Sequence, residues 1–139
     1  LPFRHVPTYL AGYYKYKAGD QFTEGGKPVN EKRDICDIYA IMYETSESVP
    51  TLDGTNAFTS PNLISTARIN NAKETNEWTY FKLPFTTLPG KFIDKEKLMD
   101  GKYNIAIVFT SSLEGDHFNG AIGSTLLIDE AELIYHSED

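Results

Sequence analysis

The stretch that decides the fold runs from Ile35 to Glu44 and reads ICDIYAIMYE. β-Branched and aromatic residues fill it, and apolar side chains recur at every second position, which is typical of a β-strand. The alternate row from Cys36 to Met42 is wholly apolar, so we expect it to face the core. The same kind of pattern predicts strands over five further stretches: Thr8 to Tyr16, Leu63 to Ile69, Trp78 to Phe85, Tyr103 to Ser112 and Ser124 to Tyr135.

Turn signals separate these stretches, at Gly25-Gly26, Asp53-Gly54, Pro89-Gly90, Asp100-Gly101 and Asn119-Gly120. Only the stretch from Ile93 to Asp100 suits a helical turn or two, ended by Gly101. Strands without intervening amphipathic helices predict an all-β fold, an antiparallel β-sandwich. Both side-chain rows of the strand that begins at Tyr103 are largely apolar, so we expect a central strand covered on both faces. Two long connections, from Lys17 to Asp34 and from Thr45 to Asn62, predict short hairpins or binding surface.

Size and charge exclude several classes of function. The chain has 139 residues, which fits one domain with a core of its own. Its formal net charge of -7 argues against nucleic-acid binding, which needs clustered lysine and arginine. No apolar run approaches the roughly 18 residues of a membrane span, so we expect no membrane insertion by this domain.

The single cysteine, Cys36, lies in an apolar run and is expected to be a buried side chain. Nothing in the sequence indicates an oligomeric state.

Hydroxyls, carboxylates and a histidine concentrate between Ser111 and Glu130, in SSLEGDHFNGAIGSTLLIDE. The serines match no nucleophile or phosphate-binding motif, so we interpret them as bonded to local turn backbone and assign no catalytic residue. Asp116 and Asp129 are candidate ligands for calcium, which prefers oxygen, and no other cofactor is indicated. If the last strand is regular, Asp129 and Glu130 point to opposite faces. Glycoside hydrolysis would need two carboxyl groups across a cleft, and this alternative stays open.

Sugar binding needs flat aromatic faces that stack on pyranose C–H groups, with hydrogen-bonding side chains at the rim. Strand alternation places Tyr14 and Tyr16 on one side of the first strand and Tyr13 with Lys15 on the other. The stretch EWTYFK likewise puts two aromatic residues on a single face. The candidates for carbohydrate contact are Tyr14, Tyr16, Trp78 and Tyr80 for stacking, and Arg68, Asp116 and Asn119 for hydroxyl groups. The competing interpretation for each aromatic residue is packing inside the sandwich.

Four segments, in order, resemble the family known as the putative carbohydrate metabolism domain: LAGYYKYKAGD, DICDIYAIMYE, WTYFKLPF and YNIAIVFTSSLEGDHFNGAIGSTLLIDEAELIY. The resemblance implies a jelly-roll or galactose-binding-like β-sandwich, similar to carbohydrate-binding modules. It implies a single domain over residues 1–139, the C-terminal part of a longer exported, lipid-anchored protein that handles glycans at the outer-membrane surface or in the periplasm. In such a domain we expect Asp116 and Asn119 to stabilise a turn and not to act as catalytic residues.

The function that we expect is therefore a non-catalytic module whose partner is a glycan or oligosaccharide. A glycoside hydrolase that uses a carboxylate pair is the first alternative. A structural or protein-interaction domain, with the tyrosines as adhesive contacts, is the second.

Overall fold

The computed structural model describes residues 5–46, 58–70, 72–113 and 119–135. Within these ranges the chain forms strands and one short helix, in the order β1 (Tyr9–Lys17), β2 (Phe22–Glu24), β3 (Lys27–Val29), β4 (Asp37–Glu44), β5 (Leu63–Arg68), β6 (Thr75–Pro84), β7 (Thr86–Thr87), α1 (Lys95–Met99), β8 (Tyr103–Thr110), β9 (Asn119–Ala121) and β10 (Thr125–Ile134). No helix in this part of the chain has the length and apolarity needed to cross a bilayer.

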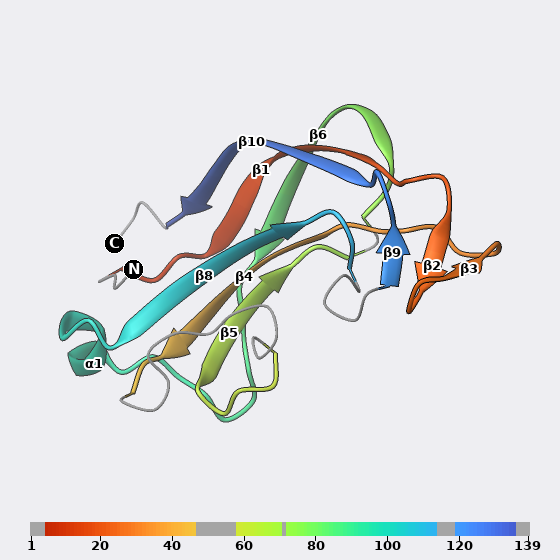
Figure 1. Cartoon of the computed structure of the whole chain (residues 1–139). Coiled ribbons are helices and arrows are strands. Elements are labelled where there is room, and N and C mark those ends of the chain that lie inside the picture. The colour runs from red at the N-terminus through yellow and green to blue at the C-terminus, as the bar shows by residue number, and fades with distance from the viewer. Residues whose placement is uncertain (1–4, 47–57, 71, 114–118, 136–139) are drawn as a thin grey trace.

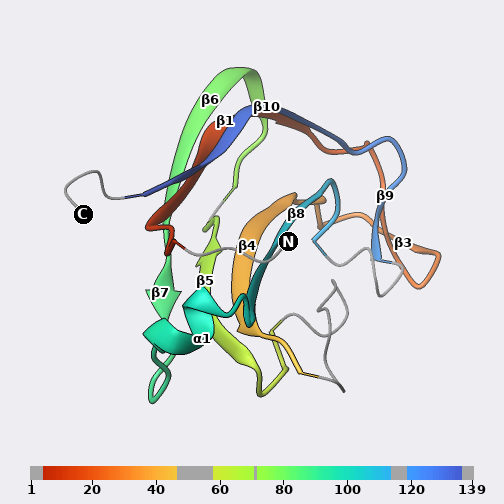
Figure 2. The ribbon, with the colours of Figure 1, turned by 90° about the vertical axis from the view of Figure 1, so that its left-hand side faces the viewer.

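Two antiparallel sheets form the body of the molecule. The β1 sheet has the strand order β10-β1-β6, and the β4 sheet has the order β7-β5-β4-β8. Figure 1 shows the two sheets one above the other. Figure 2, a quarter turn away, shows that the chain running from β6 to β7 joins the layers on one side, while β10 and β8 lie on the other side. The predicted antiparallel all-β sandwich is confirmed.

A third, small sheet, of order β3-β2-β9, lies at one end of the sandwich (Figure 1). Its β2–β3 hairpin lies in the connection from Lys17 to Asp34, for which a short hairpin or binding surface was predicted. The hairpin turns at Gly25 and Gly26, whose φ angles are 57° and 86°. Glycine adopts this left-handed region at no steric cost, which is why the pair forms a tight turn.

The core fills the space between the two large sheets. Its buried residues are Leu10, Tyr14, Tyr16, Ala18, Cys36, Ile38, Ala40, Ala67, Phe81 and Leu83. The predicted inward row of β4 therefore does face the core. Burial raises the pKa of the Cys36 thiol to about 11, which keeps it protonated and unreactive at neutral pH. The other row of β4 is buried as well, because Tyr39, Ile41 and Tyr43 pack with Leu63 on the outer face of the β4 sheet.

The strand predicted to be central, β8, lies instead at the edge of the β4 sheet. Register places Ile107 opposite Ala40 and Phe109 opposite Ile38, so both side chains are on the inner side of the sheet. They are nevertheless 40% and 38% exposed. The prediction of a strand covered on both faces is wrong here, because β8 borders the side of the sandwich where β6 and β7 do not join the layers (Figure 2). β4, with both rows buried, is the central strand.

Candidate functional site

The outer face of the β1 sheet carries a row of aromatic side chains. Tyr9 and Tyr13 come from β1, and Trp78 and Tyr80 come from β6. All four point away from the core, because the inward positions of these strands are taken by core residues such as Phe81. Tyr80 is 52% exposed and Trp78 is 44% exposed. Tyr13 lies directly opposite Tyr80 in the register, with the ring centroids 5.2 Å apart and the ring planes tilted by 55°.

Lysines cover the rings at the two ends of this row. The Nζ of Lys15 lies 4.8 Å from the centroid of the Trp78 ring, and the Nζ of Lys82 lies 4.4 Å from that of Tyr9. A cation over an aromatic face is attracted by the negative potential of the ring, and its hydrocarbon stem shields part of the ring from water. The outer face therefore already uses cation–aromatic pairing at both ends.

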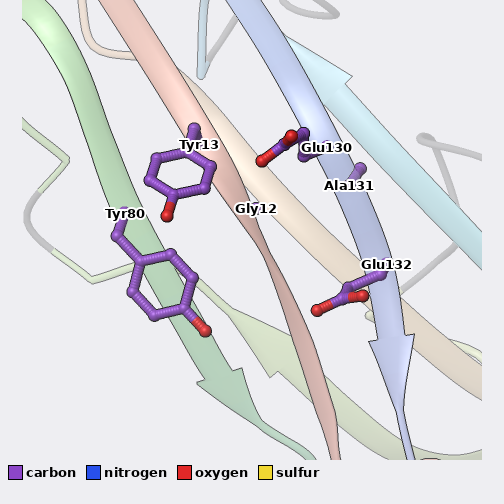
Figure 3. Close-up of a pocket in the computed structure, with 6 residues that line it drawn as sticks. All are labelled: Gly12, Tyr13, Tyr80, Glu130, Ala131 and Glu132. Carbon is purple, nitrogen blue, oxygen red and sulfur yellow. The ribbon is translucent and has the colours of Figure 1, made fainter.

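A hollow of about 510 Å³ lies beside the tyrosine pair (Figure 3). Its lining residues, which define what we call the tyrosine hollow, are Gly12, Tyr13, Tyr80, Glu130, Ala131 and Glu132. The two rings stand on one side, and the two glutamate side chains extend from β10 on the other side (Figure 3). The volume falls in the range of small-molecule sites, and the lining combines apolar faces with hydrogen-bond acceptors.

A bulge in β10 shapes the hollow. The register between β1 and β10 shifts at Gly12, so that Glu130 and Ala131 together oppose this one glycine. Glu130 has a φ of 51°, in the left-handed region that is strained for any residue except glycine. The bulge also breaks the regular alternation, since Asp129 pairs with Tyr13 on the outer side and Glu130 lines the same side. The prediction that Asp129 and Glu130 point to opposite faces required a regular strand, and the bulge removes that condition.

Gly12 brings the strands close together beneath the hollow. A Cβ atom at this position would lie 2.9 Å from Cζ of Phe81 and 3.2 Å from Cα of Ala131. Both distances are shorter than an ordinary van der Waals contact, so any side chain at this position would push the core ring or β10 away. The absence of that side chain lets the core ring and β10 pack closely against β1 beneath the hollow.

Two of the predicted stacking residues lie in the core. Tyr14 and Tyr16 are 5% and 2% exposed, so a ligand on the surface does not reach their ring faces. The Tyr16 hydroxyl donates a hydrogen bond of 2.6 Å to the carbonyl oxygen of Ser111, and burial raises the pKa of Tyr16 to about 12. Tyr14 and Tyr16 therefore pack in the core and do not provide stacking surfaces for a sugar. Trp78 and Tyr80 share one exposed face, as the alternation predicted.

The polar candidates lie elsewhere. Arg68 is on the outer face of the β4 sheet, where its guanidinium donates to both carboxylate oxygens of Asp37 at 3.1 and 2.6 Å and lies 4.2 Å from the centroid of the Phe58 ring. The side-chain oxygen of Asn119 accepts a hydrogen bond of 3.0 Å from the backbone N–H of Gly25 in the β2–β3 turn. Arg68 and Asn119 therefore do not line the hollow, and Asp116 lies outside the described residues.

The calcium prediction rested on Asp116 and Asp129. Among the residues that the structure describes, no group of three or more histidine, cysteine, aspartate or glutamate side chains is placed to hold a metal ion. A carboxylate oxygen of Asp129 instead accepts a hydrogen bond of 2.9 Å from the backbone N–H of Glu130 at the bulge. This contact gives Asp129 a role in shaping β10.

Of the residues that line the hollow, only Tyr80 was among the predicted contacts, and the side chains of Tyr13, Glu130 and Glu132 were missed. Strand alternation did place Tyr13 on the side away from Tyr14 and Tyr16, and that was the available signal. It did not tell which side faces the core. Strand alternation also places Glu130 and Glu132, which are two residues apart, on a common face, but it does not tell that this face lies beside Tyr13 and Tyr80.

The chain is similar to one family model and to two solved structures. The model is described as "Putative carbohydrate metabolism domain" and matches residues 1–134. A structure described as a putative glycoside hydrolase from Bacteroides thetaiotaomicron VPI-5482 is 88% identical, has a TM-score of 0.96, and is matched over 99% of this chain and 40% of its own. A second, described as a putative glycoside hydrolase from Bacteroides vulgatus ATCC 8482, is 46% identical, with a TM-score of 0.89, over 96% of this chain and 54% of its own. The chain thus spans about half the length of these relatives or less. No curated protein matches it.

Proposed function

Because the chain belongs to the putative carbohydrate metabolism domain family, we propose that the outer face of its β1 sheet binds carbohydrate without hydrolysing it. The observation that carries this proposal is the tyrosine hollow, in which the exposed ring of Tyr80 and the half-buried ring of Tyr13 face two carboxylates. A pyranose ring has an apolar C–H face that stacks on an aromatic ring, and its hydroxyl groups donate hydrogen bonds to carboxylates. Tyr13 and Tyr80 supply the stacking faces, and Glu130 and Glu132 supply the acceptors.

The placement of the glutamates favours binding over hydrolysis. Glu130 and Glu132 extend from one strand, on the same side of the hollow (Figure 3). Glycosidases of the common kinds place two carboxyl groups on either side of the scissile bond. The name "putative glycoside hydrolase" belongs to two chains of which this domain matches only 40% and 54%. A binding module that serves a longer carbohydrate-handling protein fits both observations.

The fluorescence of Trp78 provides a measurement of saccharide binding. Trp78 is the only tryptophan of the chain, is exposed, and lies two residues from Tyr80 on the same face of β6. We expect plant or host oligosaccharides to change its fluorescence and to release heat on titration. Replacing Tyr80 or Tyr13 by alanine should weaken binding by about tenfold, since an aromatic pair of this kind contributes about 0.5–1.5 kcal/mol beyond its buried area.

The matched control is Phe92→Ala, which removes an exposed aromatic ring that does not line the hollow. It should leave the affinity unchanged. No response of the unaltered protein across a broad panel of oligosaccharides would contradict the proposal. Release of chromophore from aryl glycosides, abolished by Glu130→Gln, would replace it with the hydrolase alternative.

A further inference from the structure

The tyrosine hollow lacks the cation that the rest of the aromatic row possesses. Lys15 covers Trp78 and Lys82 covers Tyr9. Among the described residues, no lysine or arginine lies over the ring of Tyr13 or of Tyr80. The middle of the row is thus the part where the rings present their negative faces without a positive neighbour from the described chain.

The carboxylates of the hollow also lack a cationic partner within the described chain. The salt bridges formed there join Lys32 to Glu24, Arg33 to Glu74, Arg68 to Asp37 and Lys97 to Glu44. Glu130 and Glu132 take part in none of them, and they are the charged residues that line the hollow. Two carboxylates and two ring faces therefore converge on one space, and each of these groups attracts a positive charge.

We propose that the tyrosine hollow selects saccharide units that carry a free, protonated amino group. This inference rests on the proposed function and names the class of sugar that the same site prefers. The ammonium group of an amino sugar lies between Glu130 and Glu132 and donates charge-assisted hydrogen bonds to them. The apolar face of the same ring stacks on Tyr13 and Tyr80, whose ring faces also attract the cation.

The negative charge of the lining residues predicts an order of affinity among the competing ligands. A neutral sugar still stacks and still donates hydroxyl hydrogen bonds, but it offers no charge to either carboxylate. A uronic-acid unit brings a third negative charge next to Glu130 and Glu132, and the chain as a whole already carries a formal net charge of -7. We therefore expect affinity to fall from amino sugar to neutral sugar to uronic acid.

The test uses calorimetric titration of the whole chain with three oligosaccharides: a β-1,4-linked glucosamine oligomer, its N-acetylated counterpart, and a galacturonic-acid oligomer. The titrations are run at about pH 6, where an amino group with a pKa near that of an α-amine is protonated. The glucosamine oligomer should bind about fivefold or more tightly than the acetylated one, a modest factor because ion pairs at an exposed site are screened by water. The galacturonic-acid oligomer should bind most weakly. Raising the salt concentration should reduce the preference.

Two variants locate the preference in the hollow. Glu130→Gln and Glu132→Gln keep the side-chain shape and remove one charge each. Each should remove most of the advantage of the glucosamine oligomer, while the affinity for the acetylated oligomer changes by less than about twofold. Glu31→Gln is the control, because it makes the same charge change at an exposed residue that does not line the hollow. It should leave the preference intact.

The outcomes separate this inference from the proposed function. Equal binding of the three oligomers, or a preference that survives in both glutamine variants, overturns the amino-sugar inference and leaves carbohydrate binding standing. If none of the oligosaccharides binds, the amino-sugar inference and the proposed function are both overturned. A short lysine-containing peptide that binds as tightly, with the same dependence on the glutamates, would assign the cation to a protein partner instead. If a variant fails to fold, the ranking and its salt dependence in the unaltered protein still decide the matter.

Discussion

Asp34 is a buried carboxylate that joins distant parts of the chain. One of its oxygens accepts hydrogen bonds from the hydroxyls of Ser112 and Ser124 and from the backbone N–H of Ala121. Its other oxygen accepts from the backbone N–H of Ile35. These contacts connect the segment before β4 to the end of β8 and to the β9–β10 turn. The hydroxyls of Ser112 and Ser124 were predicted to bond local turn backbone, and they donate to this remote carboxylate instead.

Removing this carboxylate should destabilise the fold without touching the hollow. We expect Asp34→Ala to lower the free energy of unfolding by about 2–4 kcal/mol, because four donors lose a charged acceptor and each such bond contributes about 1.5–3 kcal/mol, not additively. Urea denaturation measures the loss. Asp20→Ala, at an exposed position, should change stability by less than about 0.5 kcal/mol. A loss below about 1 kcal/mol in the Asp34 variant would show that the cluster is not a structural anchor.

The tyrosines of β1 illustrate what alternation can tell about single residues. The pattern separated Tyr13 from Tyr14 and Tyr16, and the structure confirms that separation. It did not say which side is buried, since an aromatic side chain with one hydroxyl suits both a core and a surface. Tyr16 satisfies its hydroxyl inside the protein, through Ser111. That partner comes from a distant segment, so only the folded chain reveals it.

The six predicted strands lie within a few residues of β1, β4, β5, β6, β8 and β10, whereas the bounds of the short strands β2, β3, β7 and β9 were not predicted. The turn predicted at Asn119-Gly120 is wrong, because both residues belong to β9. The stretch predicted from Ile35 to Glu44 forms a strand over Asp37–Glu44, and that predicted from Ser124 to Tyr135 forms one over Thr125–Ile134. The predicted helical turn is α1, in which the Asp94 side chain accepts hydrogen bonds from the first free N–H groups. Such features are local, because side-chain period and capping chemistry involve neighbours in sequence.

The bulge in β10 is the element on which the site depends. It turns Glu130 into the left-handed region, at a cost of about 1–2 kcal/mol for a residue with a side chain. It also places Glu130 on the same outer side as Asp129, which pairs with Tyr13. In a regular strand these two neighbours would point to opposite faces.

Glycine substitutions at Glu130 and Glu132 should distinguish the backbone strain at Glu130 from the contribution of the two side chains to binding. Glu130→Gly should raise the free energy of unfolding by about 0.5–1 kcal/mol, because glycine relieves the left-handed strain. Glu132→Gly, within the regular part of β10, should lower it by about 0.5–1 kcal/mol. Both variants should bind saccharide more weakly than the unaltered protein. Thermal denaturation and titration test the pair, and stability changes of the same sign would contradict the assignment of strain to Glu130.

At the scale of the whole molecule, an ion pair ties three segments together. The Arg33 guanidinium, from the segment before β4, donates to both carboxylate oxygens of Glu74 at 2.8 and 2.7 Å. The same carboxylate accepts a hydrogen bond of 3.0 Å from the backbone N–H of Ala18, just after β1. The hydrogen bond from Arg33 and then that from Ala18 lower the pKa of Glu74 to about 2.

This contact makes part of the stability depend on pH. The pKa of Glu74 is lower in the folded state than its ordinary value near 4.5, so the stabilisation is present above about pH 4.5 and is lost as the pH falls through about 2. We expect Glu74→Gln to be less stable than the unaltered protein at pH 7, with the difference shrinking between about pH 4.5 and 2. Water screens this exposed pair, so the difference is small.

Urea midpoints at several pH values measure it. Arg33→Gln removes the first cause of the lowered pKa and should reproduce most of the same pH dependence. A stability difference between Glu74→Gln and the unaltered protein that stays constant with pH would contradict the assignment.

The sequence by itself determined the kinds of elements in this protein, their approximate bounds, the inward row of β4 and the separation of Tyr13 from Tyr14 and Tyr16. Each of these depends on a period of two or on a short turn, which involves residues close together in the chain. The tertiary structure decided that β8 lies at an edge, that Tyr13 faces outward, and that Glu130 and Glu132 share a hollow with Tyr80. Burial and orientation depend on which distant strands pair and in what register, and the shift of register at Gly12 brings Asp129 and Glu130 to the same side.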